Sequence, residues 1–315
     1  MQPQHKTGIN HKLPPTPKPK LPAFTIFAKT TTMTRRQLFR QFTQALSQLY
    51  PAPEAESLAG LALRHAAQTD TLQWHLGYDQ DPGEAELIRA NQILQRLLQH
   101  EPLQYITGET WFCGLRFSVN PSVLIPRPET EMLTDRIISE NKNTPNLVIA
   151  DIGTGSGCIA ISMAKLLPQS RVHAFDLSEA ALSTARSNAI AQGVEVNFYT
   201  LDILRDSLSK HLSSAGIIVS NPPYVLESDK PAMLPNVLSY EPHEALFVPD
   251  NNPLLFYHAI ASQAFQILRS GGRLYFEIHE TQGQNLIEML HQMGYTNILL
   301  SPDFNNKHRF ISASK

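Results

Sequence analysis

Apolar residues recur along this chain with two different periods, and the period changes near residue 105. Before that point they follow helical spacing, as at Leu38, Phe42 and Leu46. Similar stripes run through residues 58–66 and 87–98. This pattern predicts a small helical domain over residues 33–103. No residue in it suggests chemistry, so its expected role is packing or partner recognition.

The remainder of the chain alternates between strand-like and helix-like patterns. Aromatic and β-branched residues at 111–119 predict a short β-hairpin within a linker over residues 104–124. Strands are predicted at 147–151, 171–176, 194–201, 216–220 and 273–278, with helices at 178–191, 254–269 and 281–292. Segments 295–300 and 308–312 predict a closing antiparallel hairpin. The alternation predicts an α/β fold over residues 125–315, with a seven-stranded, mostly parallel sheet and helices on both faces.

Composition excludes several classes of protein. Of 315 residues, 42% are hydrophobic and 17% charged, which is typical of a globular protein. No apolar run approaches the ~18 residues that cross a bilayer, so no membrane association is expected. The two cysteines and twelve scattered histidines form neither a disulfide framework nor a metal-ligand motif. We therefore expect a cytoplasmic protein without a metal ion.

Charge is distributed unevenly between the N-terminal segment and the rest of the chain. Residues 1–32 contain five lysines, six prolines and no acid. The whole chain has a formal charge of −2, so residues 33–315 alone have a formal charge of −7. An acidic body disfavours nucleic-acid binding, which needs a basic face. We expect residues 1–32 to be a disordered tail or an over-long start. The segment lacks the Arg and Ser of a transit peptide and any A-x-A cleavage site.

A glycine-rich turn follows the predicted strand at 147–151. Its sequence, Gly153-Thr154-Gly155-Ser156-Gly157, has glycines where a ligand could approach the backbone, just before a helix N-terminus. Dinucleotide enzymes have G-x-G-x-x-G, whereas the third glycine here comes one residue early. The alternative is a tight strand-to-helix turn without a ligand.

Acidic residues lie at the ends of the next two predicted strands. Asp176 could accept both hydroxyls of a ribose, or instead cap the following helix. Asp202 could meet an adenine amino group, or be a solvated loop acid. Ligands of open α/β sheets bind at the carboxyl ends of the strands, so these residues predict a nucleoside site.

The sharpest motif is Asn221-Pro222-Pro223-Tyr224, directly after a buried strand. Two prolines remove two N–H donors, so the local carbonyls act only as acceptors. The Asn221 side chain adds an amide oxygen, and Tyr224 can stack on a planar group. Such acceptors would hold both hydrogens of an NH₂ group and stabilise charge that develops on its nitrogen. The alternative is a rigid turn.

Together these motifs resemble class I S-adenosylmethionine-dependent methyltransferases that act on an NH₂ nitrogen. The order of helical domain, hairpin, segment Leu124-Ile125-Pro126-Arg127-Pro128-Glu129-Thr130-Glu131, glycine loop and Asn-Pro-Pro-Tyr resembles the HemK/PrmC family of peptide chain release factor glutamine N5-methyltransferases. The resemblance covers residues 34–314. The segment before Met33 is expected to have no counterpart.

The resemblance implies a Rossmann-like methyltransferase domain and methyl transfer to the Gly-Gly-Gln glutamine of release factors. It implies that the cofactor is bound by Gly153, Thr154, Gly155, Ser156, Gly157, Asp176, Asp202, Ile203 and Asn221. It implies that the substrate glutamine is held by Asn221, Pro222, Pro223 and Tyr224 as the catalytic group, with Glu241 beside them. Many relatives have an aromatic residue in place of Ile203. Arg127 and Glu129 either close over the cofactor or form a structural ion pair, and the expected state is a monomer.

Three alternative functions stay open from the sequence. One is methylation of a glutamine in a large-subunit ribosomal protein, because that sister enzyme shares Asn-Pro-Pro-Tyr. Another is methylation of an amino group on a DNA or RNA base, because the same acceptors suit a flipped-out base. The third is a non-catalytic nucleotide-binding or scaffold protein. Cofactor binding and the identity of the methylated substrate separate all three.

Overall fold

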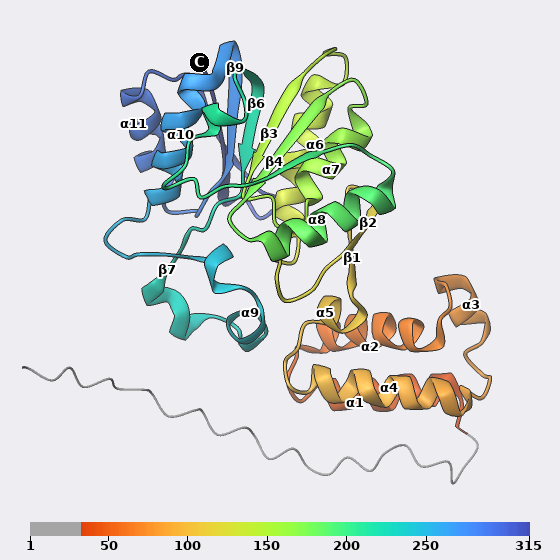
Figure 1. Ribbon diagram of the computed structural model, residues 1–315. Helices are drawn as coiled ribbons and strands as arrows, with labels where there is room; N and C mark the ends of the chain where they lie inside the picture. Colours follow the sequence, from red (N-terminus) through yellow and green to blue (C-terminus); the bar gives the residue numbers. More distant parts are fainter. Residues whose placement is uncertain (1–32) are drawn as a thin grey trace, which may run out of the picture.

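The computed structural model describes residues 33–315, and the predicted N-terminal tail, residues 1–32, lies outside the described residues (Figure 1). The described chain begins with five helices: α1 (Arg35–Leu46), α2 (Ala52–Ala67), α3 (Thr71–Leu76), α4 (Gly83–Leu97) and α5 (Leu103–Thr107). Their apolar stripes meet in one core that contains Leu38, Phe42, Leu63, Trp74 and Leu94. The predicted helical region is therefore present and has its own core.

Local chemistry explains where the first helices begin. Thr34 caps α1: its hydroxyl accepts from the Gln37 N–H, and the Gln37 side chain accepts from the Thr34 N–H. Helix α2 begins at Ala52, several residues before the apolar stripe that predicts it. Pro53 lies in its first turn, where no intrahelical N–H bond is needed. The short helices α3 and α5 have no stripe long enough to reveal them in the sequence.

A β-hairpin follows, as predicted. Strands β1 (Glu109–Phe112) and β2 (Leu115–Ser118) pair antiparallel around Cys113 and Gly114, which have φ of 48° and 71°. Two consecutive positive φ values characterise the tight hairpin turn whose twist matches the strands. Phe112 and Phe117 of the hairpin are buried in the core of the sheet domain. The hairpin thus attaches the helical region to the sheet.

The large domain is built on seven strands in the order β10-β11-β9-β6-β3-β4-β5. Their bounds are β3 Val148–Ile152, β4 Arg171–Asp176, β5 Asn197–Thr200, β6 Ala215–Ser220, β9 Leu268–Glu277, β10 Thr296–Pro302 and β11 His308–Ser314. The five strands β3, β4, β5, β6 and β9 run parallel to one another, whereas β11 pairs antiparallel with both β9 and β10. The predicted α/β class and the closing hairpin are confirmed. Strand β5 is shorter than predicted, and β9 is longer.

Helices cover both faces of this sheet (Figure 1). One face carries α6 (Pro128–Asn141), α7 (Cys158–Leu166) and α8 (Glu179–Gln192), and the other carries α10 (Leu255–Ile267) and α11 (Gly283–Gln292). Successive strand residues point to opposite faces, so Ile149 and Ile217 join one core while Ala150 and Ile218 join the other. Both faces are buried, which explains the continuous apolar runs in the sequence.

A small lobe between β6 and α10 completes the fold. It contains β7 (Val225–Leu226), η2 (Glu227–Ala232), α9 (Pro235–Tyr240), η3 (His243–Ala245) and β8 (Phe247–Val248), and the remaining short helix, η1, spans Leu208–Lys210. The Tyr240 hydroxyl donates to the Gln99 carbonyl at 2.9 Å, which joins this lobe to the end of the helical region. The lobe therefore lies near both the end of β6 and the helical region.

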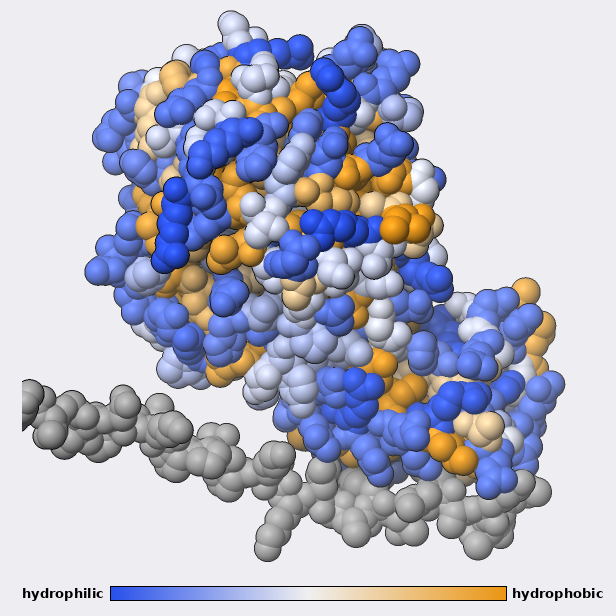
Figure 2. All heavy atoms as spheres, viewed as in Figure 1, coloured by the Kyte–Doolittle hydropathy of each residue, from blue (hydrophilic) through white to orange (hydrophobic). Residues whose placement is uncertain are grey.

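The visible surface is largely polar. On the face shown in Figure 2, hydrophilic residues predominate and apolar side chains appear in small groups between them. Among residues 33–315, no helix has both the length and the apolar character needed to span a bilayer.

Candidate active site

A cavity of about 340 Å³ opens at the carboxyl ends of β3, β4 and β6. This size falls within the range of small-molecule sites, and the position is where open α/β sheets bind ligands. Eight of the predicted site residues line it: Gly153, Gly155, Asp176, Asp202, Ile203, Asn221, Pro222 and Pro223. The fold therefore brings together residues from four separate segments of the sequence.

The glycine turn forms one wall of the cavity. Gly153 and Gly155 have φ of 74° and 55°, which side-chain-bearing residues rarely adopt. A Cβ on either residue would meet no atom within 4 Å, so the space above the turn is open to a ligand. Gly157 differs, because its Cβ would lie 2.7 Å from Ile161 Cδ1 and 3.1 Å from Ala185 Cβ. Its lack of a side chain allows α7 and α8 to pack closely.

Asp176 is held rigidly at the end of β4. Its Oδ2 accepts from the Gly155 N–H at 2.8 Å and its Oδ1 from the Ser178 N–H at 2.9 Å. Burial raises the pKa of this carboxyl, and these backbone donors oppose the rise. A carboxylate has about four acceptor sites, so two remain for hydroxyls of a ligand. Helix α8 is capped by the Ser178 hydroxyl, so Asp176 is not its side-chain cap.

Asp202 lines the cavity but also organises its own loop. Its Oδ1 accepts from the Leu204 N–H at 3.0 Å, and its Oδ2 lies 3.4 Å from Arg205 Nε. Beside it the wall is apolar, formed by Ile203 with Phe256 and Ile260 from α10. A flat base could pack there, with a diol at Asp176 and a flexible tail over the glycine turn. The acceptor oxygens of Asp176 and Asp202 and the apolar wall therefore fit a nucleoside-containing cofactor.

The Asn221-Pro222-Pro223-Tyr224 motif directly follows β6, and its first three residues line the cavity. A second cavity of about 40 Å³ also borders Asn221 and Pro222, and Tyr224 and Arg127 lie around it. The two cavities therefore share the Asn221–Pro222 wall. Within the described residues, neither Asn221 Oδ1 nor the Pro222 carbonyl accepts a hydrogen bond. These oxygens are available to a substrate.

The side chains of this motif are anchored to a buried acid. Asn221 Nδ2 donates to Thr130 Oγ1 at 3.0 Å, and the Thr130 hydroxyl donates to Glu277 Oε2 at 2.6 Å. The Tyr224 hydroxyl donates to Glu277 Oε1 at 3.0 Å. Burial raises the pKa of the Tyr224 hydroxyl, as does the nearby Glu277 carboxylate, so that hydroxyl keeps its proton. The sequence indicated Thr130 only as part of the segment 124–131, and no pattern indicated Glu277, which follows the apolar residues 274–276 at the end of β9.

Glu241 anchors another part of the wall. Its Oε1 accepts from Arg127 Nη2 at 2.5 Å and its Oε2 from the Ile125 N–H at 3.2 Å. Arg127 therefore pairs with Glu241 and not with Glu129, which has no ion pair within the described residues. Glu241 borders neither cavity, so its contact with a substrate stays a prediction.

Other predicted cofactor residues lie behind the cavity wall. The Thr154 hydroxyl donates to Asp151 Oδ2 at 2.6 Å, and Ser156 is buried with no partner for its Oγ among the described residues. Together with Gly157 they shape the turn, and their direct contact with a cofactor stays a prediction. No sequence pattern predicted that Phe256, Ile260, Ser122 and Val123 line the cavity, because each looks like ordinary core or loop sequence. Leu124 also lines it, although the sequence indicated it only as the first residue of the segment 124–131.

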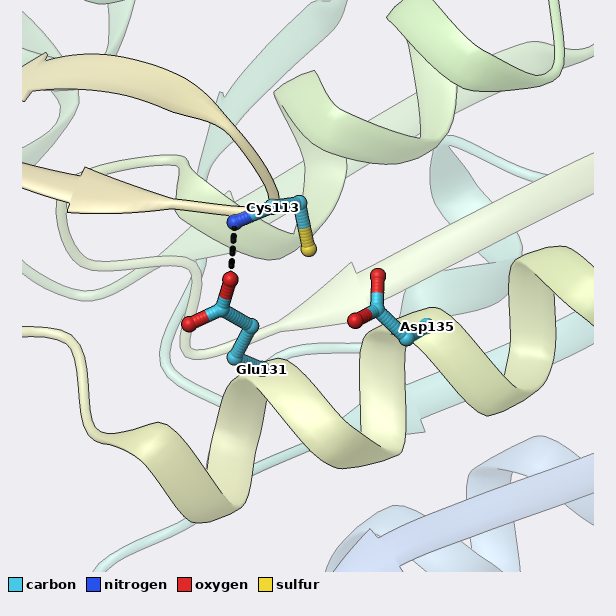
Figure 3. A group of neighbouring side chains, drawn as sticks. All are labelled: Cys113, Glu131 and Asp135. Carbon is cyan, nitrogen blue, oxygen red and sulfur yellow. Dashed lines mark hydrogen bonds between the residues drawn. The ribbon is translucent and has the colours of Figure 1, made fainter.

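A separate group of possible metal ligands lies away from the cavity (Figure 3). Cys113, Glu131 and Asp135 offer ligand atoms within 4.8 Å of one another. Glu131 Oε1 already accepts from the Cys113 N–H at 2.7 Å, and so fastens the hairpin turn to α6. Burial and the Asp135 carboxylate raise the pKa of the Cys113 thiol far above its usual range, which keeps it protonated. The hydrogen bond from the Cys113 N–H to Glu131 gives this group a structural role.

Comparison with known proteins assigns the chain to a family. Residues 129–240 match the methyltransferase small domain, and residues 16–108 match the PrmC N-terminal domain. A release factor glutamine methyltransferase from Bacteroides thetaiotaomicron is 43% identical over 86% of this chain and 97% of its own length. The chain belongs to the release factor glutamine methyltransferase family. This confirms the resemblance inferred from the motifs.

The chain is also similar to a second curated relative and to a solved structure. The Flavobacterium psychrophilum member is also 43% identical, over 87% of this chain and 96% of its own length. Among solved structures, a methyltransferase from Pyrococcus furiosus is 18% identical with a TM-score of 0.46, over 64% of this chain and 90% of its own. The PrmC N-terminal match begins at residue 16, so part of the segment expected to have no counterpart falls within that family model.

Proposed function

We propose that this protein transfers a methyl group from S-adenosylmethionine to the side-chain amide nitrogen of the Gly-Gly-Gln glutamine in peptide chain release factors. The observation that carries this proposal is the Asn221–Pro222 wall shared by the two cavities. It presents two unused acceptor oxygens between a nucleoside-sized cavity and a small pocket. Membership of the family selects the release factor glutamine among substrates that carry an NH₂ group.

The cofactor supplies an electrophilic methyl group on its sulfonium, and the residues of the larger cavity position it. Asp176 would accept from the ribose hydroxyls, and Ile203 and Phe256 would enclose the adenine. Asp202 would meet the adenine amino group. Gly153 and Gly155 would allow the methionine portion to approach the backbone, with Thr154, Ser156 and Gly157 supporting the turn.

The substrate amide is a weak nucleophile because its nitrogen lone pair is delocalised. Asn221 Oδ1 and the Pro222 carbonyl would accept its two N–H groups, which holds the nitrogen in line and favours the positive charge that develops there. Pro223 keeps the backbone in this conformation because its φ is restricted. Tyr224 would bound the planar amide, and Glu241 would hold the nearby wall through Arg127.

We further propose the domain roles. The helical region, residues 33–103, would grip the release factor, and residues 104–124 would link it to the catalytic domain, residues 125–315. The short helix α5 crosses the first of these boundaries. We propose a cytoplasmic monomer, because the substrates act in translation and the site is complete within one chain.

A parallel labelling experiment tests the function. The full chain would be incubated with methyl-labelled S-adenosylmethionine and either a release factor, the same factor with its Gly-Gly-Gln glutamine replaced by alanine, ribosomal proteins or DNA. We expect label only on the intact release factor, located on that glutamine by mass spectrometry. Label on ribosomal protein or DNA would overturn the substrate, and no label anywhere would overturn the enzymatic function.

A further inference from the structure

The carboxylate of Glu277 accepts hydrogen bonds from two hydroxyl groups beside the candidate active site. Glu277 is only 1% exposed at the end of β9. Thr130, in the first turn of α6, donates to its Oε2 at 2.6 Å, and Tyr224 donates to its Oε1 at 3.0 Å. Three segments that are distant in sequence therefore meet at one buried acid.

Burial raises the pKa of the Glu277 carboxyl, whereas the hydroxyls of Thr130 and Tyr224 and the positive charge of Arg309 oppose the rise. Both hydroxyls donate to this carboxyl group, each to a different oxygen. The single proton of Thr130 is thereby committed to Glu277.

This commitment fixes the orientation of the Asn221 amide. Thr130 Oγ1 has only acceptor capacity left, so the amide must present its Nδ2 to Thr130, as it does at 3.0 Å. The opposite orientation would place Oδ1 against a hydroxyl oxygen with no proton between them. Oδ1 is therefore left on the other side of the amide, with no donor among the described residues.

We propose that Glu277 and Thr130 are positioning residues that keep Asn221 Oδ1, rather than its NH₂ group, directed at the substrate nitrogen. Glu277 also holds the Tyr224 ring through its hydroxyl, so one acid aligns both ends of the Asn-Pro-Pro-Tyr motif. This inference rests on the proposed function. It adds the reason why the motif presents an acceptor to the substrate. A flipped Asn221 amide would direct its own NH₂ group at the NH₂ group of the substrate, and two donors cannot bond to each other.

Substitutions at Thr130 test this proposal because they separate the hydroxyl from the shape of the side chain. Thr130→Val removes the hydroxyl at nearly constant volume, and we expect kcat for release factor methylation to fall about 10- to 100-fold, with cofactor affinity unchanged. Thr130→Ser keeps the hydroxyl, and should stay within about threefold of the parent. Glu277→Gln has a single amide oxygen, whereas the hydroxyls of Thr130 and Tyr224 each donate to a separate oxygen of Glu277. We expect this variant to lower kcat at least as far as Thr130→Val.

Thr134 provides a matched control on the same helix. It is fully buried, and its hydroxyl donates only to the Thr130 carbonyl at 2.9 Å. Thr134→Val loses a buried threonine hydroxyl without touching the Asn221 amide, so its kcat should remain near that of the parent. A fall in Thr134→Val or Thr130→Ser as large as that in Thr130→Val would mean a general packing effect and would overturn the proposal. An unchanged kcat in Thr130→Val would overturn it as well.

A measurement without substrate separates this proposal from the proposed function. The side-chain NH₂ signals of Asn221 would be recorded by NMR on asparagine-labelled protein and assigned by their loss in Asn221→Ala. We expect Thr130→Val, but not Thr134→Val, to shift the signal of the bonded proton and speed its exchange with water. An unaltered signal in Thr130→Val would overturn the positioning role even if the parent methylates release factors. An inactive parent with the expected NMR change would overturn the function and leave the amide orientation supported.

Discussion

The guanidinium of Arg127 donates to the carboxylate of Glu241 at 2.5 Å, although 114 positions separate the two residues. The Glu241 side chain is 1% exposed and that of Arg127 is 32% exposed. The same carboxylate accepts from the Ile125 N–H. This contact joins the segment before α6 to the loop after α9, and so sets the separation of two parts of the cavity wall.

Replacing Glu241 should therefore destabilise the fold. Glu241→Ala leaves the Ile125 N–H without its acceptor and Arg127 without its partner, and we expect a loss of about 2–3 kcal/mol in the free energy of unfolding. Urea denaturation measures it. The exposed pair Arg36–Asp79 supplies the control, since Asp79→Ala should change stability by less than about 1 kcal/mol. Equal losses in the two variants would contradict a special role for the buried contact.

Asn221→Ala should separate catalysis from cofactor binding. Removing the amide oxygen takes away an acceptor that is used as charge develops on nitrogen, so we expect kcat to fall at least about 100-fold. Cofactor affinity, measured by calorimetry, should change little because Asp176 and the glycine turn remain. Activity within a few-fold of the parent would remove Asn221 from the clamp.

Asp176→Ala should have the opposite effect. Charge-assisted hydrogen bonds contribute about 1.5–3 kcal/mol each, so losing those to the ribose should weaken cofactor binding by at least about tenfold. The turnover of the saturated enzyme should fall much less than in Asn221→Ala. The same calorimetric titration decides the matter: an unchanged dissociation constant would exclude Asp176 from the ribose site.

Two glycines of the same turn should respond differently to alanine. Gly157→Ala adds a Cβ at φ of 81° only 2.7 Å from Ile161 Cδ1, so strain and overpacking should cost about 2–4 kcal/mol of stability. Gly153→Ala adds it at φ of 74° into open space, so only the backbone strain of about 1–2 kcal/mol should appear. The Gly153 variant should lose cofactor affinity more than the Gly157 variant does. The reverse order in the two measurements would contradict the assignment of Gly153 to the cavity and Gly157 to helix packing.

The buried Asp151 should make stability depend on pH. Desolvation raises its pKa from 3.8 to about 7, despite the hydroxyl that Thr154 donates to it. Between these values the folded chain holds a proton that the unfolded chain has lost, so stability falls as pH rises, with a limiting slope of about 1.4 kcal/mol per pH unit. Urea denaturation between pH 4 and 8 should show this fall in the parent and a flatter profile in Asp151→Asn. Parallel profiles would show that Asp151 does not titrate in this window.

Periodicity predicted most of the fold because it reports local geometry. Alternating strands and helices over residues 147–292 indicated the parallel sheet, and two apolar segments at the C-terminus indicated the antiparallel strands β10 and β11. Helices α3 and α5 were missed because six and five residues are too few to show a helical stripe. Helix α3 packs on α2, and α5 packs on both α2 and α4, and local sequence does not display such contacts.

The sequence by itself determined the chemistry offered at the cavity. In the Asn-Pro-Pro-Tyr motif the prolines have no N–H group, so the acceptor oxygens follow from the residue types alone. Gly153 and Gly155 permit the positive φ that the turn adopts beside the cavity. Tertiary structure alone decided which residues complete the site. Thr130 and Glu277 are 147 positions apart and meet only because α6 packs beside the end of β9. Contacts of this kind arise from packing between distant elements, which no local pattern encodes.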